Sequence, residues 1–242
     1  MRILVISDIH ANLTALRTVL IDAAPFDATW CLGDLVGYGP DPEACVVRVR
    51  EIPNFSCLLG NHDAAVIGHI DIASFNPEAR QAIQWTQNTL SAESKDYLRS
   101  LPERLVIDSV TLAHGSPRHP IWEYLLDVRA ATQNFNYFET PYCFVGHSHL
   151  PVIFQLNGGQ KYADLLVPQS GAKVDMLPRA ILNPGSVGQP RDRNPRAAYA
   201  IYKPEENTLE FRRVAYDISE VQERMQTAGL PSRHIERLTA GW

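Results

Sequence analysis

Five of the eight histidines in this chain stand in short polar clusters with aspartate, asparagine and glycine. In chain order, the clusters are Asp8-Ile9-His10, Gly33-Asp34, Gly60-Asn61-His62-Asp63, His114-Gly115 and Gly146-His147-Ser148-His149. Imidazole, carboxylate and amide groups without sulfur suit divalent transition metals. With His62 set aside, the donors are too many for one tetrahedral site. The set therefore predicts two neighbouring cations, which could hold the attacking and the leaving oxygen of a phosphoryl displacement.

Each cluster directly follows a short apolar run that predicts a strand. These runs span residues 3–6, 29–32, 55–59, 111–113 and 142–145. The carboxyl ends of parallel strands share one edge of a sheet, where ligands of α/β proteins bind. We therefore expect the five clusters to meet in space. Asp8 and His10 are two residues apart, as are His147 and His149, so an extended backbone would place each pair on one side of the chain.

Helices are predicted between these strands from capping residues and apolar spacing. Asn12 is typical of a helix N-cap and precedes apolar residues at helical spacing up to position 23. The Asp-Pro-Glu sequence at 41–43 begins a second helix that ends near residue 50, and Asn76 with the following proline begins a third. The resulting β-α-β-α-β order implies parallel strands joined by right-handed crossovers.

The second half of the chain is richer in predicted strands. A hairpin is expected over 151–167, further strands over 105–107, 179–182, 197–203 and 208–214, and helices over 91–100, 128–138 and 219–228. The last helix is expected to stop at Gly229 and Pro231, as glycine-capped helices do. Together the elements predict an α/β fold of two packed sheets with helices outside. No linker or repeat interrupts it, so we expect a single domain over residues 1–242.

Composition excludes several classes of protein. The 242 residues are 45% hydrophobic and 20% charged, as in an ordinary globular protein. The net charge of −5 disfavours non-specific binding to nucleic acid or to a membrane surface. The four cysteines lie in apolar runs without a CxxC pair, which favours free thiols in a reducing compartment. Without a signal-peptide pattern or a run of ~20 apolar residues, a cytoplasmic protein that is not membrane-bound is expected.

The order D-x-H, G-D, G-N-H-D, a lone H and G-H-x-H resembles that of the calcineurin-like binuclear metallophosphoesterases, and all five blocks are complete. Three further stretches, at 37–40, 183–191 and 228–231, resemble the small bacterial and archaeal phosphodiesterase branch of that family. The resemblance thus covers nearly the whole chain. It implies a four-layer αββα sandwich of two mixed sheets flanked by helices.

The resemblance also implies a role for each residue of the motif. One metal would be bound by Asp8, His10 and His149, the other by Asn61, His114 and His147, and Asp34 would bridge the two. His62 would face the leaving-group oxygen as a general acid or electrostatic donor, and Asp63 would orient and charge it. The donors suit Mn, Fe, Ni, Co or Zn, with manganese or iron preferred.

Arg191 and His119 are two further candidates for substrate contact. Arg191 lies in the stretch 183–191, and His119 lies five residues after His114. The simplest interpretation of each is a solvated loop side chain, and a phosphate contact is the alternative. No dinucleotide fingerprint or P-loop is present.

The function implied is that of a metal-dependent phosphoric ester hydrolase. A phosphodiesterase that attacks a small soluble phosphoester with a metal-bridging hydroxide is the leading hypothesis. A phosphoprotein or dinucleoside-polyphosphate phosphatase is the second, and a non-catalytic binding scaffold of the same fold is the third. Exposed apolar strand edges in the second half also leave a homodimer open.

Overall fold

The computed structural model describes residues 1–242 and consists of two mixed six-stranded sheets flanked by helices. In spatial order the first sheet contains β3 (Phe55–Cys57), β2 (Ala28–Cys31), β1 (Ile3–Ile6), β11 (Ala197–Lys203), β12 (Thr208–Val214) and β9 (Lys173–Asp175). The second contains β4 (Arg104–Ile107), β5 (Val110–Ala113), β6 (Tyr142–Phe144), β10 (Ala180–Asn183), β7 (Val152–Gln155) and β8 (Asp164–Leu166). The triplets β1-β2-β3 and β5-β6-β10 are parallel, and the remaining pairs are antiparallel.

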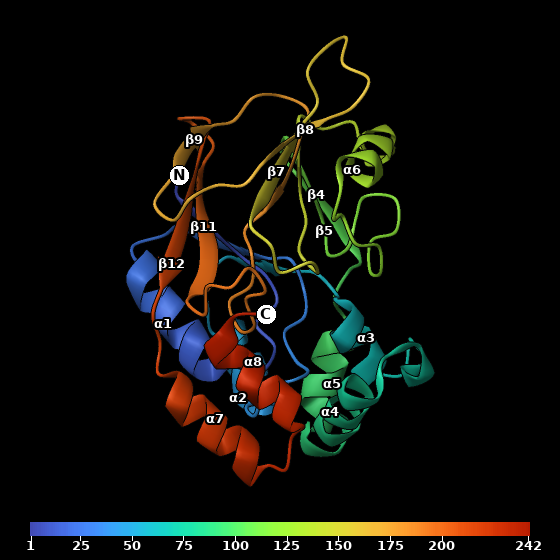
Figure 1. Cartoon of the computed structure of the whole chain (residues 1–242), viewed down its shortest axis with the longest axis vertical. Helices are drawn as coiled ribbons and strands as arrows, with labels where there is room; N and C mark the ends of the chain where they lie inside the picture. Colours follow the sequence, from blue (N-terminus) through green and yellow to red (C-terminus); the bar gives the residue numbers. More distant parts are fainter.

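Helices cover the outer faces of both sheets. They are α1 (Leu13–Ala23), α2 (Pro42–Arg50), α3 (Asn61–Val66), α4 (Pro77–Thr89), α5 (Ala92–Arg99), α6 (Val128–Asn134), α7 (Ile218–Thr227) and α8 (Ser232–Ala240). Two 3₁₀ turns, η1 (Ile72–Ser74) and η2 (Phe135–Tyr137), complete the order. Figure 1 shows α6 beside the second sheet and the other helices gathered around the first. No helix is long and apolar enough to cross a bilayer.

Three apolar clusters join these layers. The one between the sheets contains Trp30, Phe144 and Tyr202, whose ring centroids are 5.6–6.1 Å apart. A larger cluster joins the first sheet to its helices, and a smaller one joins the second sheet to α6. The four layers expected from the sequence are therefore present.

Most predicted helix starts are confirmed at the level of single hydrogen bonds. The side-chain oxygens of Asn12, Asn76 and Ser91 accept from the third backbone N–H beyond each of them. Asp41 makes no such bond, because its carboxylate pairs with Arg224 of α7 at 3.0 Å.

Four elements, α3, α8, β9 and the 3₁₀ turn η1, were not predicted, and one was predicted too long. The chain does not stop after α7 but continues into α8, which buries His234, Ile235 and Leu238. Helix α3 and strand β9 are only six and three residues long, too short for an apolar period to be recognised. The helix expected over 128–138 is divided into α6 and η2.

Candidate metal centre

The loops that follow β1, β2, β3, β5 and β6 bring the seven expected metal ligands to one place between the ends of the two sheets. The free oxygen of Asp34, Oδ2, lies 3.6 Å from His10 Nε2 and 3.5 Å from His114 Nε2. His149 Nε2 lies 3.3 Å from Asp8 Oδ1 and 3.1 Å from His10 Nε2. Side chains from both sheets thus meet around Asp34.

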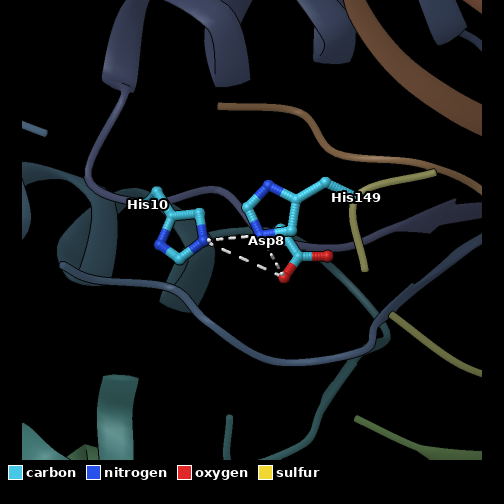
Figure 2. A group of neighbouring side chains, drawn as sticks. All are labelled: Asp8, His10 and His149. Carbon is cyan, nitrogen blue, oxygen red and sulfur yellow. Dashed lines mark hydrogen bonds and ion pairs between the residues drawn. The ribbon is translucent and has the colours of Figure 1, made fainter. Parts of the chain in front are cut away.

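Donor atoms form three overlapping triads within this centre. Figure 2 shows Asp8, His10 and His149 with their donor atoms turned toward one another. Asp34, His114 and His147 form a second triad, and His10, Asp34 and His62 a third. Asn61 joins the second triad, since its Oδ1 lies 3.1 Å from His114 Nε2.

Backbone carbonyls fix the orientation of three of the imidazoles. The Nδ1 atoms of His10, His114 and His149 lie 3.2, 2.8 and 2.6 Å from the carbonyls of residues 36, 32 and 189. With Nδ1–H donating to a carbonyl, the lone pair of Nε2 is available as a ligand. All three Nε2 atoms lie in the centre, so the rings are held in the orientation that a metal requires.

Both carboxylates are held through one oxygen and free at the other. Asp8 Oδ2 accepts a hydrogen bond from the backbone N–H of His147 at 3.1 Å, and Asp34 Oδ1 accepts one from the backbone N–H of His62 at 2.9 Å. Asp8 Oδ1, Asp34 Oδ2 and His147 Nε2 are buried without any partner. Buried polar atoms are normally satisfied. Three orphaned acceptors at one point fit a site for divalent cations.

Burial makes the charges of this centre costly without a counter-ion. It raises the pKa of Asp8 to about 7 and lowers the pKa of His10, His147 and His149 well below the usual histidine range. Burial opposes charge on His114 too, but the carboxylate of Asp34 raises its pKa to about 9. Bound cations would supply positive charge to the desolvated carboxylates and would favour the neutral form of the imidazoles that bind them.

A family model for the calcineurin-like phosphoesterase superfamily domain matches residues 1–207. The chain belongs to this superfamily. It is 39% identical over 246 residues to an uncharacterized protein of Methanocaldococcus jannaschii, covering 99% of this chain and 98% of that protein. The crystal structure of a metallophosphoesterase from Sphaerobacter thermophilus matches with a TM-score of 0.92 at 49% identity, covering 100% and 99% of the two chains.

The fold extends to more distant proteins. The crystal structure of a hypothetical protein from Pyrococcus horikoshii OT3 matches this chain with a TM-score of 0.81 at 20% identity, covering 100% of this chain and 98% of that one. The family and the fold expected from the motifs are thereby confirmed.

The backbone of this chain does not present the proposed ligands in the way that strand alternation predicts. Asp8, His10, Asp34, His147 and His149 all have positive φ, between 48° and 63°. The expectation of an extended backbone around both D-x-H and H-x-H is therefore wrong. Left-handed turns aim these side chains instead. Such a conformation is uncommon outside glycine and persists where surrounding contacts enforce it.

The stretch 183–191 supplies part of that enforcement. The carbonyl of Asp8 accepts from Ser186 Oγ at 2.8 Å and from the N–H of Gly188 at 2.9 Å. A Cβ on Gly188 would lie 1.8 Å from the carbonyl oxygen of Ile9, so only glycine allows this approach. The support that this stretch gives to the backbone of Asp8 was not predicted from the sequence, in which the stretch is only a point of resemblance to the family.

His62 lies beside the centre, whereas Asp63 faces away from it. The His62 ring is 5.0 Å from that of His10 and 4.3 Å from that of Tyr38, and its Nδ1 has no partner. Burial lowers the pKa of His62 to about 4. The third triad shows that His62 could also reach a metal.

The expected contact between Asp63 and His62 is not formed. Asp63 accepts instead from the N–H groups of Leu35, Val36 and Gly60, at 3.1–3.2 Å. The physical reason is its position in the first turn of α3. There the carboxylate turns back to the N–H of Gly60 at the helix start and also reaches the two N–H groups of the loop after β2. Asp63 therefore fixes two site loops rather than the imidazole.

Aromatic side chains line the centre on the side of the loop 114–124. Tyr124 stacks on His147 with centroids 3.7 Å apart, and Trp122 lies 6.3 Å from the same ring and 5.0 Å from Phe75. Both Tyr124 and Trp122 are exposed. His119 is exposed as well and belongs to none of the triads, whereas Arg191 is half-buried and lies 5.8 Å over the Tyr38 ring.

Glu123 anchors this loop and should make its stability depend on pH. Burial favours the protonated acid, but hydrogen bonds from Arg118, Ser116 and Asn134 lower the pKa of Glu123 to about 2. Its stabilising effect is therefore complete above its ordinary value of 4.5 and is lost as the pH falls toward 2. We expect Glu123→Gln to lower the free energy of unfolding by about 2 kcal/mol at pH 7.

Urea unfolding at several pH values tests this. Between pH 5 and pH 3 the wild type should lose stability more steeply than Glu123→Gln, and the two curves should converge. Parallel curves would contradict the role given to Glu123.

Proposed function

We propose that this protein hydrolyses a phosphodiester of a small soluble compound with two bound divalent cations. The observation that carries the proposal is the convergence of the seven donors, with buried carboxylate and imidazole atoms left free toward a common centre. The absence of thiolate donors among them favours Mn, Fe, Ni, Co or Zn as six-coordinate or five-coordinate ions.

Two sets of ligands would hold the ions. They are Asp8, His10 and His149 for one, and Asn61, His114 and His147 for the other, with Asp34 shared. Such cations supply Lewis acidity toward a phosphate and toward water when bound. The protein's contribution is orientation: carbonyls fix three imidazoles, and backbone N–H groups fix one oxygen of each carboxylate. A site this rigid loses little entropy when the phosphate binds.

His62 is proposed to face the leaving oxygen as a general acid or electrostatic donor. Burial lowers the pKa of its imidazole and keeps it neutral, and a neutral imidazole still donates one N–H. The backbone N–H of His62 donates to Asp34 Oδ1, which holds the main chain at His62 next to the shared carboxylate. Its Nδ1 has no protein partner, and a Cβ on Gly37 would come within 2.6 Å of that atom. The ring is thus confined by the loop after β2 while remaining free of competing hydrogen bonds at Nδ1. A positioned proton donor contributes about 10²–10⁴-fold to the rate.

Hydrolysis of bis(p-nitrophenyl) phosphate tests the proposal. We expect turnover by the metal-loaded wild type and none by His147→Ala, which removes a ligand. His62→Asn should keep its metal content and lose about 10²–10³-fold in kcat, because only proton donation is removed. A folded, metal-loaded wild type that cleaves neither this diester nor p-nitrophenyl phosphate would overturn the proposal and favour a binding scaffold. Cleavage of the monoester alone would overturn the diester assignment.

A further inference from the structure

Two arginines from distant parts of the chain lie together at the edge of the metal centre. Arg191 belongs to the stretch 183–191, and Arg237 belongs to α8, which was not foreseen in the sequence. Both donate to one atom, Gln189 Oε1, from Arg191 at 3.0 Å and from Arg237 at 3.3 Å. A shared acceptor makes the two guanidinium groups neighbours.

No carboxylate forms an ion pair with either arginine. Neither has an aspartate or glutamate oxygen within 4.0 Å, whereas Arg213 and Arg224 do. Glu78 and Asp8 act on Arg237 and Arg191 only from farther away. The Nε atoms of Arg191 and Arg237 are buried and have no hydrogen-bond partner. Burial and the charge of Arg191 both lower the pKa of Arg237. Two adjacent, half-buried cations with unused donors are unfavourable unless an anion lies between them.

The pair is directly connected to the reaction site. The Arg191 guanidinium lies over the ring of Tyr38, which packs 4.3 Å from His62 and 4.7 Å from His10. Gln189 accepts both arginines through its side chain and accepts His149 Nδ1 through its carbonyl at 2.6 Å. One residue, Tyr38 or Gln189, thus separates the arginine pair from side chains of the metal centre.

We propose that Arg191 and Arg237 form a second oxyanion subsite, which binds a phosphoryl group adjacent to the one that is cleaved. The substrate class is then a disubstituted phosphate in which one substituent is a further phosphoryl group, as in a nucleoside polyphosphate. Planar guanidinium groups bind phosphate oxygens in pairs, and two of them can share a tetrahedral oxyanion. This inference rests on the proposed function for the position of the first phosphate.

Binding of AMP and ADP measured by calorimetry, at a fixed concentration of free metal, tests the subsite without requiring turnover. ADP should bind at least tenfold more tightly than AMP to the wild type. Arg237→Gln should remove most of this preference and change AMP affinity less than about threefold. Arg233→Gln is the matched control, since Arg233 lies on the same helix and over the same Trp242 ring but has no contact with Gln189, and it should keep the preference.

Equal affinities of AMP and ADP for the wild type, or an undiminished preference in Arg237→Gln, would overturn the subsite. Should Arg237→Gln fail to fold, Arg237→Lys keeps the charge without the planar fork and should lose about three- to tenfold in ADP preference. Hydrolysis of bis(p-nitrophenyl) phosphate by the same samples separates the two proposals. If the samples hydrolyse the diester but show no preference for ADP, the proposed function stands and the subsite does not. If they show an Arg237-dependent preference for ADP but no hydrolysis, the subsite stands and the proposed function does not.

Discussion

Replacing Asp34 by asparagine should abolish binding of one of the two cations and reduce diester hydrolysis at least about a thousandfold, or about 4 kcal/mol of transition-state stabilisation. Asp34 Oδ2 is within 3.6 Å of imidazoles from both proposed ligand sets, so a single atom is placed to serve both proposed ions. Asparagine keeps the shape and can still accept the N–H of His62, but it removes the negative charge that two neighbouring cations require. The fold should therefore survive while the metal pair does not.

Metal content per chain, kcat and the thermal unfolding midpoint together test this expectation. Asp96→Asn provides the control, because Asp96 is an exposed residue of α5 that pairs only with Arg99. Without metal, Asp34→Asn should be less stable than the wild type at neutral pH. Burial opposes the charge of Asp34, but the neighbouring imidazoles, His114 first, lower its pKa well below the usual range, and its charge therefore stabilises the fold. Two retained ions with activity within tenfold of the wild type would show that Asp34 is not shared.

Truncating Asp63 to alanine should lower the free energy of unfolding by about 3–5 kcal/mol. The Asp63 carboxylate is fully buried and satisfies three backbone N–H groups, two after β2 and one before α3. Those loops carry Asp34 and Asn61, so metal affinity should fall as well. Asp63→Asn should have an intermediate effect, because its amide retains one acceptor but turns an NH₂ group toward a donor.

The same substitution distinguishes the observed role of Asp63 from the role implied by resemblance. If Asp63 acted by orienting His62, Asp63→Ala would reproduce the kinetics of His62→Asn and leave metal content and stability near those of the wild type. Urea unfolding and metal analysis of the two variants side by side decide between these patterns. We expect stability loss in Asp63→Ala and rate loss alone in His62→Asn.

The convergence of the seven proposed ligands could be predicted from the sequence because residue type and order were sufficient. Asp8, Asp34 and His147 follow strands whose apolar runs are unmistakable, and parallel strands end at a common edge. Helix starts at Asn12 and Asn76 were predictable for a similar reason, since a cap depends on residues within one turn of it.

The remaining features depend on contacts between distant residues. The left-handed turns at Asp8 and His10 are enforced by the stretch around Gly188, in which Ser186 bonds Asp8 across 178 positions of the chain. Asp63 satisfies N–H groups of a loop that precedes it by 27 and 28 residues. Arg237 reaches the site only because α8 folds back after Gly229, where a glycine and a proline predict an end.

The central claim is that two cations share Asp34, and anomalous diffraction from crystals grown with Mn²⁺ tests it most directly. Two anomalous peaks about 3.5–4 Å apart are expected in each chain. One should contact Asp8, His10 and His149, the other Asn61, His114 and His147, and Asp34 should contact both. A single peak, or a pair in which Asp34 contacts only one ion, would contradict the claim.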